Sequence, residues 1–235
     1  ADVGRSEGVG AVSFLEQYDA NTQGRDFFVG DIHGQYDLLM KAMASVAFDR
    51  DRDRLFSVGD LIDRGAQSLD CLSLPFEPWF FGVRGNHEML AYDALFSTAG
   101  EEWRKRELWM VNGGTWSLRE DLNEVKMVLK EAMRHLPYAR EVSVAGKRIG
   151  IVHAEPPDDW SRLELEDNHA GHERLVWRRS RIKAGDTTPV DGIDAVVVGH
   201  SIVSALTTLG NVHYIDTGAF MTGRLTVIEA TDLLE

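Results

Sequence analysis

Cysteine and long apolar segments are nearly absent from this sequence. Cys71 is the single cysteine among 235 residues, so neither an intrachain disulfide nor a zinc site built from several cysteines can form. No apolar stretch exceeds about six residues, whereas a membrane-spanning helix needs about 20. The first residues lack the basic segment and apolar run that are typical of a signal peptide. We therefore expect a soluble, cytoplasmic protein with no membrane association.

Positive charge is also scarce. The chain carries 25 Lys and Arg residues against 38 Asp and Glu residues, which gives a formal net charge of −13 at pH 7. Most of such a surface would repel a nucleic acid, so no nucleic-acid partner is expected. Apolar residues make up 43% of the sequence, which is enough to bury a core and excludes a disordered chain.

Short apolar runs that end near a glycine recur along the chain. Three of them, at 26–30, 55–59 and 79–83, are each followed by charged residues and then by a segment with helical spacing. This succession of strand, loop and helix predicts an α/β layer architecture. Two further strands of the same kind are predicted at 148–152 and 195–199.

The remaining segments carry less information. One amphipathic helix is predicted at 122–136, where Pro137 ends it. The last strands, at 212–215 and 225–228, are predicted to form a closing hairpin without helices.

No composition change marks a second domain. We predict a single catalytic domain over residues 26–235 and an N-terminal arm or edge segment over residues 1–25. Between Glu155 and Val176 we predict a long acidic loop that acts as a lid or specificity loop, its acids concentrated in 155–172.

Polar residues at the ends of the predicted strands form one set. They are Asp31, His33, Asp60, Asn86, His153 and His200. One such residue after a strand is typical of a turn, but the carboxyl ends of neighbouring strands converge on one crevice, so the whole set is expected to lie together. Its oxygen and imidazole donors suit Mn²⁺, Fe²⁺ or Zn²⁺. Six donors exceed the needs of one tetrahedral ion, which favours two ions that share a carboxylate.

Three motifs contain four of these residues and the polar residues beside them. They are Gly30–Gly34 (GDIHG), Gly59–Gly65 (GDLIDRG) and Arg84–Glu88 (RGNHE). They resemble the signature motifs of the phosphoprotein phosphatase family of metallophosphoesterases, in particular its bacteriophage lambda type of serine/threonine phosphatase. The segments 112–114, 176–179 and 214–219 agree with that type, and the resemblance covers residues 26–230. It implies a calcineurin-like metallophosphoesterase fold, an α/β fold with a two-sheet β-sandwich core flanked by helices.

The resemblance also implies how the metal ions are held. Asp31 and His33 would bind the first ion, and Asp60 would bridge the two ions. The second ion would be completed by Asn86, His153 and His200. The two divalent ions would most readily be Mn²⁺, with Fe or Zn as alternatives.

Other residues of the motifs receive roles in catalysis by the same resemblance. His87 would be the general acid that protonates the leaving oxygen, and Asp63 would orient it. A carboxylate beside an imidazole favours the protonated form that a general acid needs. Arg64 and Arg179 would hold the phosphate, with Asn86 as a further substrate contact. Arg178 and Arg181 are neighbours that could take the place of Arg179.

The implied activity is metal-dependent hydrolysis of phosphate monoesters on phosphorylated proteins or peptides by direct attack of water. Serine and threonine esters would be the main substrates, with some phosphotyrosine or small phosphoester activity, and no obligate partner is inferred. One alternative is a dinucleoside-tetraphosphate hydrolase. Those enzymes usually lack the acid at Asp63, and the acidic loop would repel a nucleotide. Another is a metal-binding regulatory protein without turnover.

Overall fold

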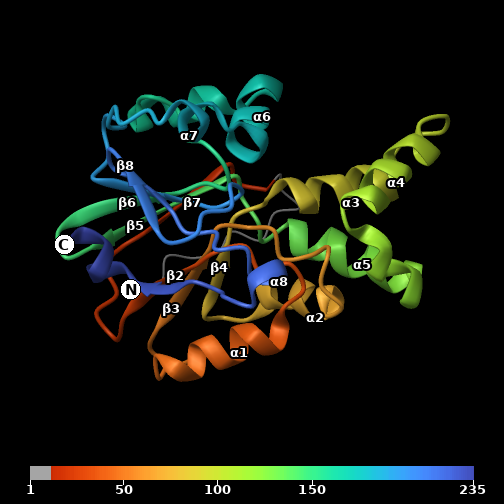
Figure 1. Cartoon of the computed structure of the whole chain (residues 1–235), viewed down its shortest axis with the longest axis horizontal. Coiled ribbons are helices and arrows are strands. Elements are labelled where there is room, and N and C mark those ends of the chain that lie inside the picture. Colours follow the sequence, from red (N-terminus) through yellow and green to blue (C-terminus); the bar gives the residue numbers. More distant parts are fainter. Residues whose placement is uncertain (1–11) are drawn as a thin grey trace.

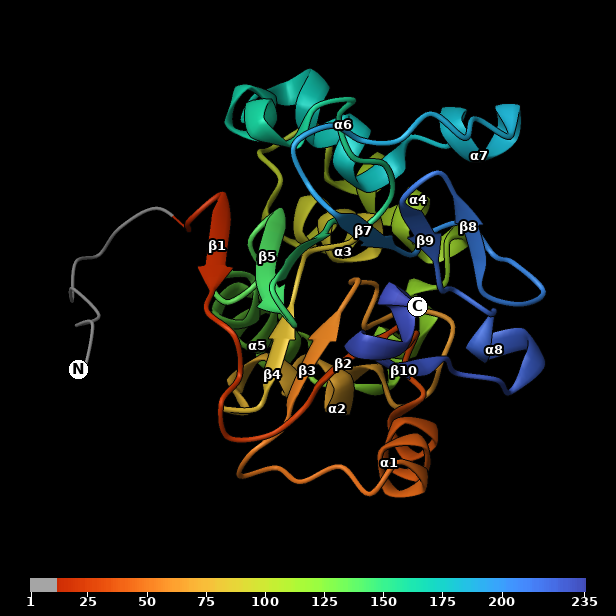
Figure 2. The ribbon, with the colours of Figure 1, turned by 90° about the vertical axis from the view of Figure 1, so that its left-hand side faces the viewer.

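The computed structural model describes residues 12–235, so the prediction for residues 1–11 lies outside the described part. Its strands form two sheets that pack against one another, with helices on the outer side of each (Figure 1). The view turned by 90° shows α1 and α6 at opposite ends of this stack of layers (Figure 2). The predicted α/β fold with a two-sheet core flanked by helices is confirmed.

The smaller sheet has the strand order β10–β2–β3–β4. These strands are β2 (Asp26–Val29), β3 (Arg54–Ser57), β4 (Phe80–Gly82) and β10 (Val227–Glu229). The first three are parallel, and β10 runs antiparallel to β2. Phe27 and Val29 belong to the core on the helical side, whereas Phe28 belongs to the core between the sheets. Because both faces are covered, the strand is apolar throughout instead of alternating.

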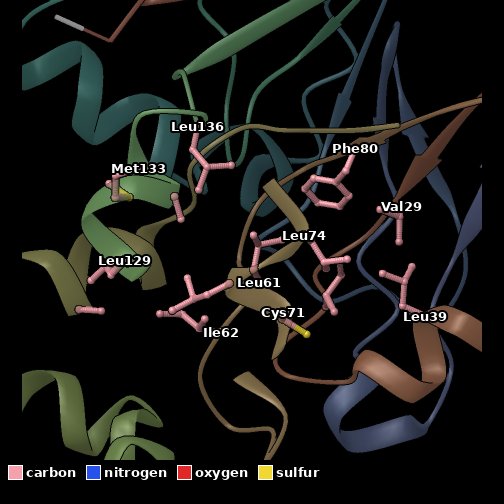
Figure 3. Close-up of a cluster of buried hydrophobic side chains, with 14 of the residues drawn as sticks. Val29, Leu39, Leu61, Ile62, Cys71, Leu74, Phe80, Leu129, Met133 and Leu136 are labelled. Atoms are coloured by element: carbon pink, nitrogen blue, oxygen red, sulfur yellow. The ribbon is translucent and has the colours of Figure 1, made fainter. Parts of the chain in front are cut away.

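Five helices and the smaller sheet enclose the largest apolar core. They are α1 (Tyr36–Ser45), α2 (Ser68–Leu72), α3 (Asn86–Phe96), α4 (Glu102–Val111) and α5 (Leu122–Met133), with 3₁₀ turns η1 (Leu74–Phe76) and η2 (Gly114–Arg119). This core includes Leu39 of α1, which lies on the side of Val29, Leu129 of α5, which lies beside Met133, and Cys71 of α2 (Figure 3). None of the helices within residues 12–235 is both long enough and apolar enough to cross a membrane.

The larger sheet has the order β1–β5–β6–β7–β9–β8. Its strands are β1 (Leu15–Tyr18), β5 (Ala139–Val144), β6 (Lys147–Ile151), β7 (Ala195–Val198), β8 (Thr207–Leu209) and β9 (Val212–Tyr214). The strands β6, β7 and β9 are parallel neighbours. Val197 packs between the sheets, while Val196 and Val198 pack against the outer layer. The N-terminal strand β1 lies at one edge of this sheet, parallel to β5.

The predicted C-terminal hairpin is wrong. β9 belongs to the larger sheet and pairs with β7 and β8, whereas β10 pairs with β2 of the smaller sheet. The short helix α8 (Ala219–Thr222) separates the two strands, and the turn η4 (Ala230–Leu234) follows β10. The segment after β9 therefore crosses from one sheet to the other, where Gly30 donates its N–H to Thr226 O at 3.1 Å.

The acidic segment 155–176 is also not the predicted loop. It contains the turn η3 (Trp160–Glu166) and most of α6 (His169–Trp177), and the short helix α7 (Ser180–Ala184) follows. Trp160, Leu163 and Leu175 are buried against the outer face of the larger sheet, so apolar contacts fix the segment in place. The segment is rich in charged residues, and its few buried apolar residues are widely spaced, so its composition predicted a loop.

Candidate metal site

All six predicted metal-binding residues lie together, immediately beyond the carboxyl ends of β2, β3, β4, β6 and β7. Every one of their side chains is buried. Asp60 is at the centre: its Oδ2 lies 3.6 Å from His33 Nε2 and 3.2 Å from His153 Nε2. Asp31 Oδ2 lies 3.7 Å from His33 Nε2, and Asn86 Oδ1 lies 2.9 Å from His153 Nε2.

The donor atoms form two groups that share one carboxylate. Asp60, His33 and His87 make one group, and Asp60, His153 and His200 make the other; within each, the donor atoms lie within 4.8 Å of one another. Two ions bridged by a common carboxylate require such an arrangement. The geometry therefore implies a dinuclear metal site.

The histidine rings have the orientation of metal ligands. His33 Nδ1 bonds to Ile62 O at 2.8 Å and His153 Nδ1 bonds to Val58 O at 2.6 Å. His200 bonds through Nε2 to Trp177 O at 2.9 Å. Since a carbonyl only accepts, each ring donates an N–H there and turns its other nitrogen towards the cluster. The residues present thus fit divalent ions.

Burial and crowded charge set the protonation of these groups. Desolvation lowers the pKa of His33 to about 4 and that of His200 to about 3, so both rings are neutral and able to bind a cation near pH 7. Burial, together with the charges of Asp216 and Asp60, raises the pKa of Asp31 well above its usual range. Divalent cations would relieve this concentration of negative charge.

Asp60 is fixed by its backbone and by a second carboxylate. It has a left-handed φ of +55°, a conformation that non-glycine residues rarely adopt and that accumulates at functional sites. Glu88 is fully buried and accepts the N–H groups of Asp60 at 2.8 Å, Leu61 at 3.0 Å and Gly85 at 3.0 Å. A Cβ on Gly85 would collide with Asp60 Oδ1. The sequence contained Glu88 within a motif, but only the fold shows this role.

His87 has a different hydrogen-bond partner from His33, His153 and His200. Its Nδ1 lies 2.8 Å from Asp63 Oδ2, and its Nε2 lies 3.9 Å from Asp60 Oδ2. Burial disfavours the imidazolium, but the charges of Asp60 and Asp63 outweigh burial and raise the pKa of His87 above its usual value. The other oxygen of Asp63 accepts the indole N–H groups of Trp109 and Trp116, two residues that sequence reasoning missed.

The candidate phosphate arginines lie at the rim of the site. Arg64 is exposed, and its guanidinium carbon lies 4.5 Å from the centre of the Phe220 ring, which in turn contacts the ring of His33. Arg179 is exposed and donates from Nη2 to His200 O at 3.3 Å, so it bonds to one of the six candidate metal-binding residues. Phe220 directly follows the segment 214–219, which agreed with the family pattern. The sequence did not indicate that Phe220 contacts Arg64 and His33.

The neighbouring arginines have structural partners. Arg181 is buried and donates to Thr188 O at 2.5 Å and Asp186 O at 3.3 Å. Arg178 Nε lies 3.9 Å from Glu155 Oε2. Within residues 12–235, Arg179 is the one of these three arginines that hydrogen-bonds to a residue of the cluster.

A family model, the calcineurin-like phosphoesterase domain, matches residues 27–204. The chain belongs to this family. It is 38% identical over 206 residues to serine/threonine-protein phosphatase 2 of Salmonella typhimurium, with 84% of this chain and 88% of the relative covered. It is 39% identical to serine/threonine-protein phosphatase 1 of the same organism, with 85% and 88% covered. A crystal structure of a putative diadenosine tetraphosphatase has the same fold, with a TM-score of 0.60, 21% identity and coverage of 93% and 94%.

Proposed function

We propose that this chain is a metal-dependent phosphatase that hydrolyses the phosphate monoesters of phosphoserine and phosphothreonine in proteins or peptides. One observation carries the proposal: the buried cluster around Asp60 lies directly beside the hydrogen-bonded pair His87 and Asp63. The serine/threonine-protein phosphatases to which the chain is similar support the choice of substrate. Activity on phosphotyrosine and small phosphoesters is proposed as secondary.

We assign the six clustered residues to two ions. Asp31, His33 and Asp60 would hold the first, and the second would be held by Asp60, Asn86, His153 and His200. Two divalent ions would supply an acidified water and positive charge next to the phosphate. Mn²⁺ is proposed, with Fe or Zn as alternatives, because the donors combine carboxylate, amide and imidazole.

The protein's own residues would perform three further tasks. Arg64 and Arg179 would bind the phosphate oxygens and offset their charge with bidentate hydrogen bonds, and Asn86 would contact the substrate. A water oxygen forms a bond to phosphorus as the bond from phosphorus to the side-chain oxygen breaks. His87 gives its Nε2 proton to that departing oxygen, so the products are inorganic phosphate and the free alcohol. Asp63 keeps the ring in place through Nδ1.

The proposed domain organisation follows the same evidence. We propose one catalytic domain over residues 26–235, with residues 1–25 as an N-terminal segment whose strand β1 adds an edge strand to the larger sheet. A cytoplasmic location is proposed because the buried single cysteine fits a reducing compartment.

The second candidate is a dinucleoside-tetraphosphate hydrolase, which shares the fold. Asp63 argues against it, since the resemblance associates this acid with protein phosphatases. Charge repulsion from the acidic segment is weaker than its composition indicates. Glu155 is buried, and Glu166 pairs with Arg174 at 3.3 Å.

One assay distinguishes the candidates. Phosphate release is measured from a phosphoserine peptide and from diadenosine tetraphosphate, each with Mn²⁺ and with chelator. We expect the peptide to have the higher kcat/KM and both activities to need the metal. A higher kcat/KM for the nucleotide would favour the hydrolase, and no turnover of either would favour a regulatory metal-binding protein.

A further inference from the structure

Two tryptophans donate hydrogen bonds to one oxygen of Asp63. Trp109 Nε1 lies 2.9 Å and Trp116 Nε1 lies 2.8 Å from Asp63 Oδ1. The other oxygen, Oδ2, bonds to His87 Nδ1 at 2.8 Å. All four side chains are buried, with Trp109 and Asp63 fully enclosed. Oδ1 of the carboxylate thus bonds to the two indoles, and Oδ2 bonds to the imidazole.

The chain between the two tryptophans is built around this contact. Trp109 lies in the last turn of α4 and Trp116 lies in η2, and their rings meet edge to face with centroids 6.1 Å apart. The turn that joins them passes through Gly113, whose φ of +114° suits only glycine. Gly113 O also accepts the N–H of Arg64 at 2.9 Å. One segment therefore contacts both Asp63 and the residue that follows it.

Building on the proposed function, we propose that Trp109 and Trp116 are positioning residues for the general acid His87. A carboxylate can rotate about its last bond and offer either oxygen to a neighbour. Two donors on Oδ1 fix that rotation and leave Oδ2 for the imidazole, which aims Nε2 of His87 at the reacting phosphate ester. An indole suits this position because it only donates, so it does not compete for the proton of His87, and its rings exclude water.

A role in packing alone would have a different signature. Phenylalanine keeps an aromatic ring in the core but removes the N–H group. Loss of one hydrogen bond to the charged carboxylate should lower a rate that depends on its position about tenfold. The loss should appear only where the leaving oxygen needs a proton. Aryl phosphates with acidic leaving groups depart without one, so their rates should change much less.

The test compares Trp109→Phe and Trp116→Phe with the control Trp103→Phe. Trp103 lies on the same helix as Trp109 but is 69% exposed. For a phosphoserine peptide we expect kcat to fall about tenfold in each buried variant, with KM within about twofold of wild type. For p-nitrophenyl phosphate we expect a fall of less than about threefold. The control should match wild type on both substrates.

Two features keep the test decisive if a variant folds poorly. The ratio of the two rates within one preparation does not depend on the folded fraction, so partial unfolding leaves it unchanged. In addition, Trp116→Phe should have no further effect on the peptide rate in a His87→Asn background. The proposal would be overturned if the ratio of the peptide rate to the p-nitrophenyl phosphate rate were unchanged, or if Trp116→Phe caused the same loss with His87 and with Asn at position 87. In either case the proposed function would stand as long as the wild-type protein hydrolysed the peptide. Wild-type protein with no peptide activity would instead refute the proposed function itself.

Discussion

Asp60 Oδ2 and His153 Nε2 lie 3.2 Å apart, and the opposite nitrogen of the same imidazole bonds to the Val58 carbonyl. Val58 and Asp60 follow β3, whereas His153 follows β6, so this contact joins the smaller sheet to the larger one. The cluster therefore forms only when both sheets are packed, which links the candidate metal site to the complete fold.

Removal of metal should abolish activity. Chelator-treated protein is expected to retain little phosphatase activity and to recover it with added Mn²⁺, because the two ions would supply the acidified water and positive charge next to the phosphate. Bound metal is measured by elemental analysis alongside kcat. Full activity after verified metal removal would contradict the proposal, as would full activity with one ion per chain.

Substitution of the shared carboxylate should be more damaging than substitution of a ligand to one ion. Asp60→Asn is expected to lower the metal content at both sites, whereas Asn86→Ala should chiefly weaken the second. The check is metal stoichiometry and kcat/KM for both variants at the same Mn²⁺ concentration. Equal stoichiometry in the two variants would show that Asp60 is not shared.

His87→Asn should lower kcat on alkyl phosphates by ~10²–10⁴ and leave the metal content near normal. The reason is that His87 bonds through Nδ1 to the Asp63 carboxylate, whereas the rings of His33, His153 and His200 each bond to a backbone carbonyl. The deficit should shrink as the leaving group becomes more acidic. A series of aryl phosphates measures this dependence, and a deficit of equal size across the series would mean that His87 positions the metal or the substrate.

Much of the site could be predicted from sequence because its residues follow strands. Asp31, Asp60 and His200 each follow a short apolar run, and such runs can be recognised as strands from the sequence. The sequence did not show that β2 and β3 belong to one sheet and β7 to the other. The partners of a buried group do not follow from such patterns. Nothing local links Trp116 to Asp63, 53 positions apart, and only the packed fold brings them within 2.8 Å.

The errors have the same physical origin. The pairing of β10 with β2 joins segments about 200 residues apart, and a hairpin prediction assumes local pairing. The segment 155–176 was predicted to be a loop because it is acidic, whereas burial of Trp160 and Leu175 determines its position. Sequence patterns thus identified many helices and strands and the polar residues that follow the strands. Contacts between residues far apart in the sequence depend on tertiary packing, so these patterns did not predict them.

Arg179→Ala should lower kcat/KM by ~10–10³ through a raised KM, since it removes a charge-assisted contact with phosphate. Arg178→Ala should do much less, because Arg178 lies near Glu155 and has no bond to the cluster within the described residues. Kinetics on one phosphoserine peptide compare the two variants. The reverse result would reassign the phosphate contact to Arg178.

Glu155→Ala should change KM in the same direction as Arg179→Ala. The buried Glu155 carboxylate accepts Ser180 Oγ at 2.8 Å and the Arg181 N–H at 2.5 Å, so it fixes the chain immediately after Arg179. The exposed Glu164 is a matched control on the same segment. In an Arg179→Ala background, Glu155→Ala should add little to the loss of kcat/KM. Additive losses would show that Glu155 acts on something other than Arg179.

The pair Arg25 and Asp53 should make stability depend on pH at a place remote from the metal cluster. Burial raises the pKa of Asp53, but the bonds from Arg25 and from the Asp49 N–H outweigh burial and lower it below its usual value. A carboxyl whose pKa is lowered by folding stabilises the native state above its unfolded pKa of about 4, and this contribution is lost as the pH falls through the folded value. Asp53→Asn should therefore cost about 1–2 kcal/mol near pH 7, with a difference from wild type that shrinks below pH 4. Urea unfolding across this range measures it, with the exposed Asp51→Asn as control. A difference that stays constant down to pH 2 would show that the charge of Asp53 contributes nothing.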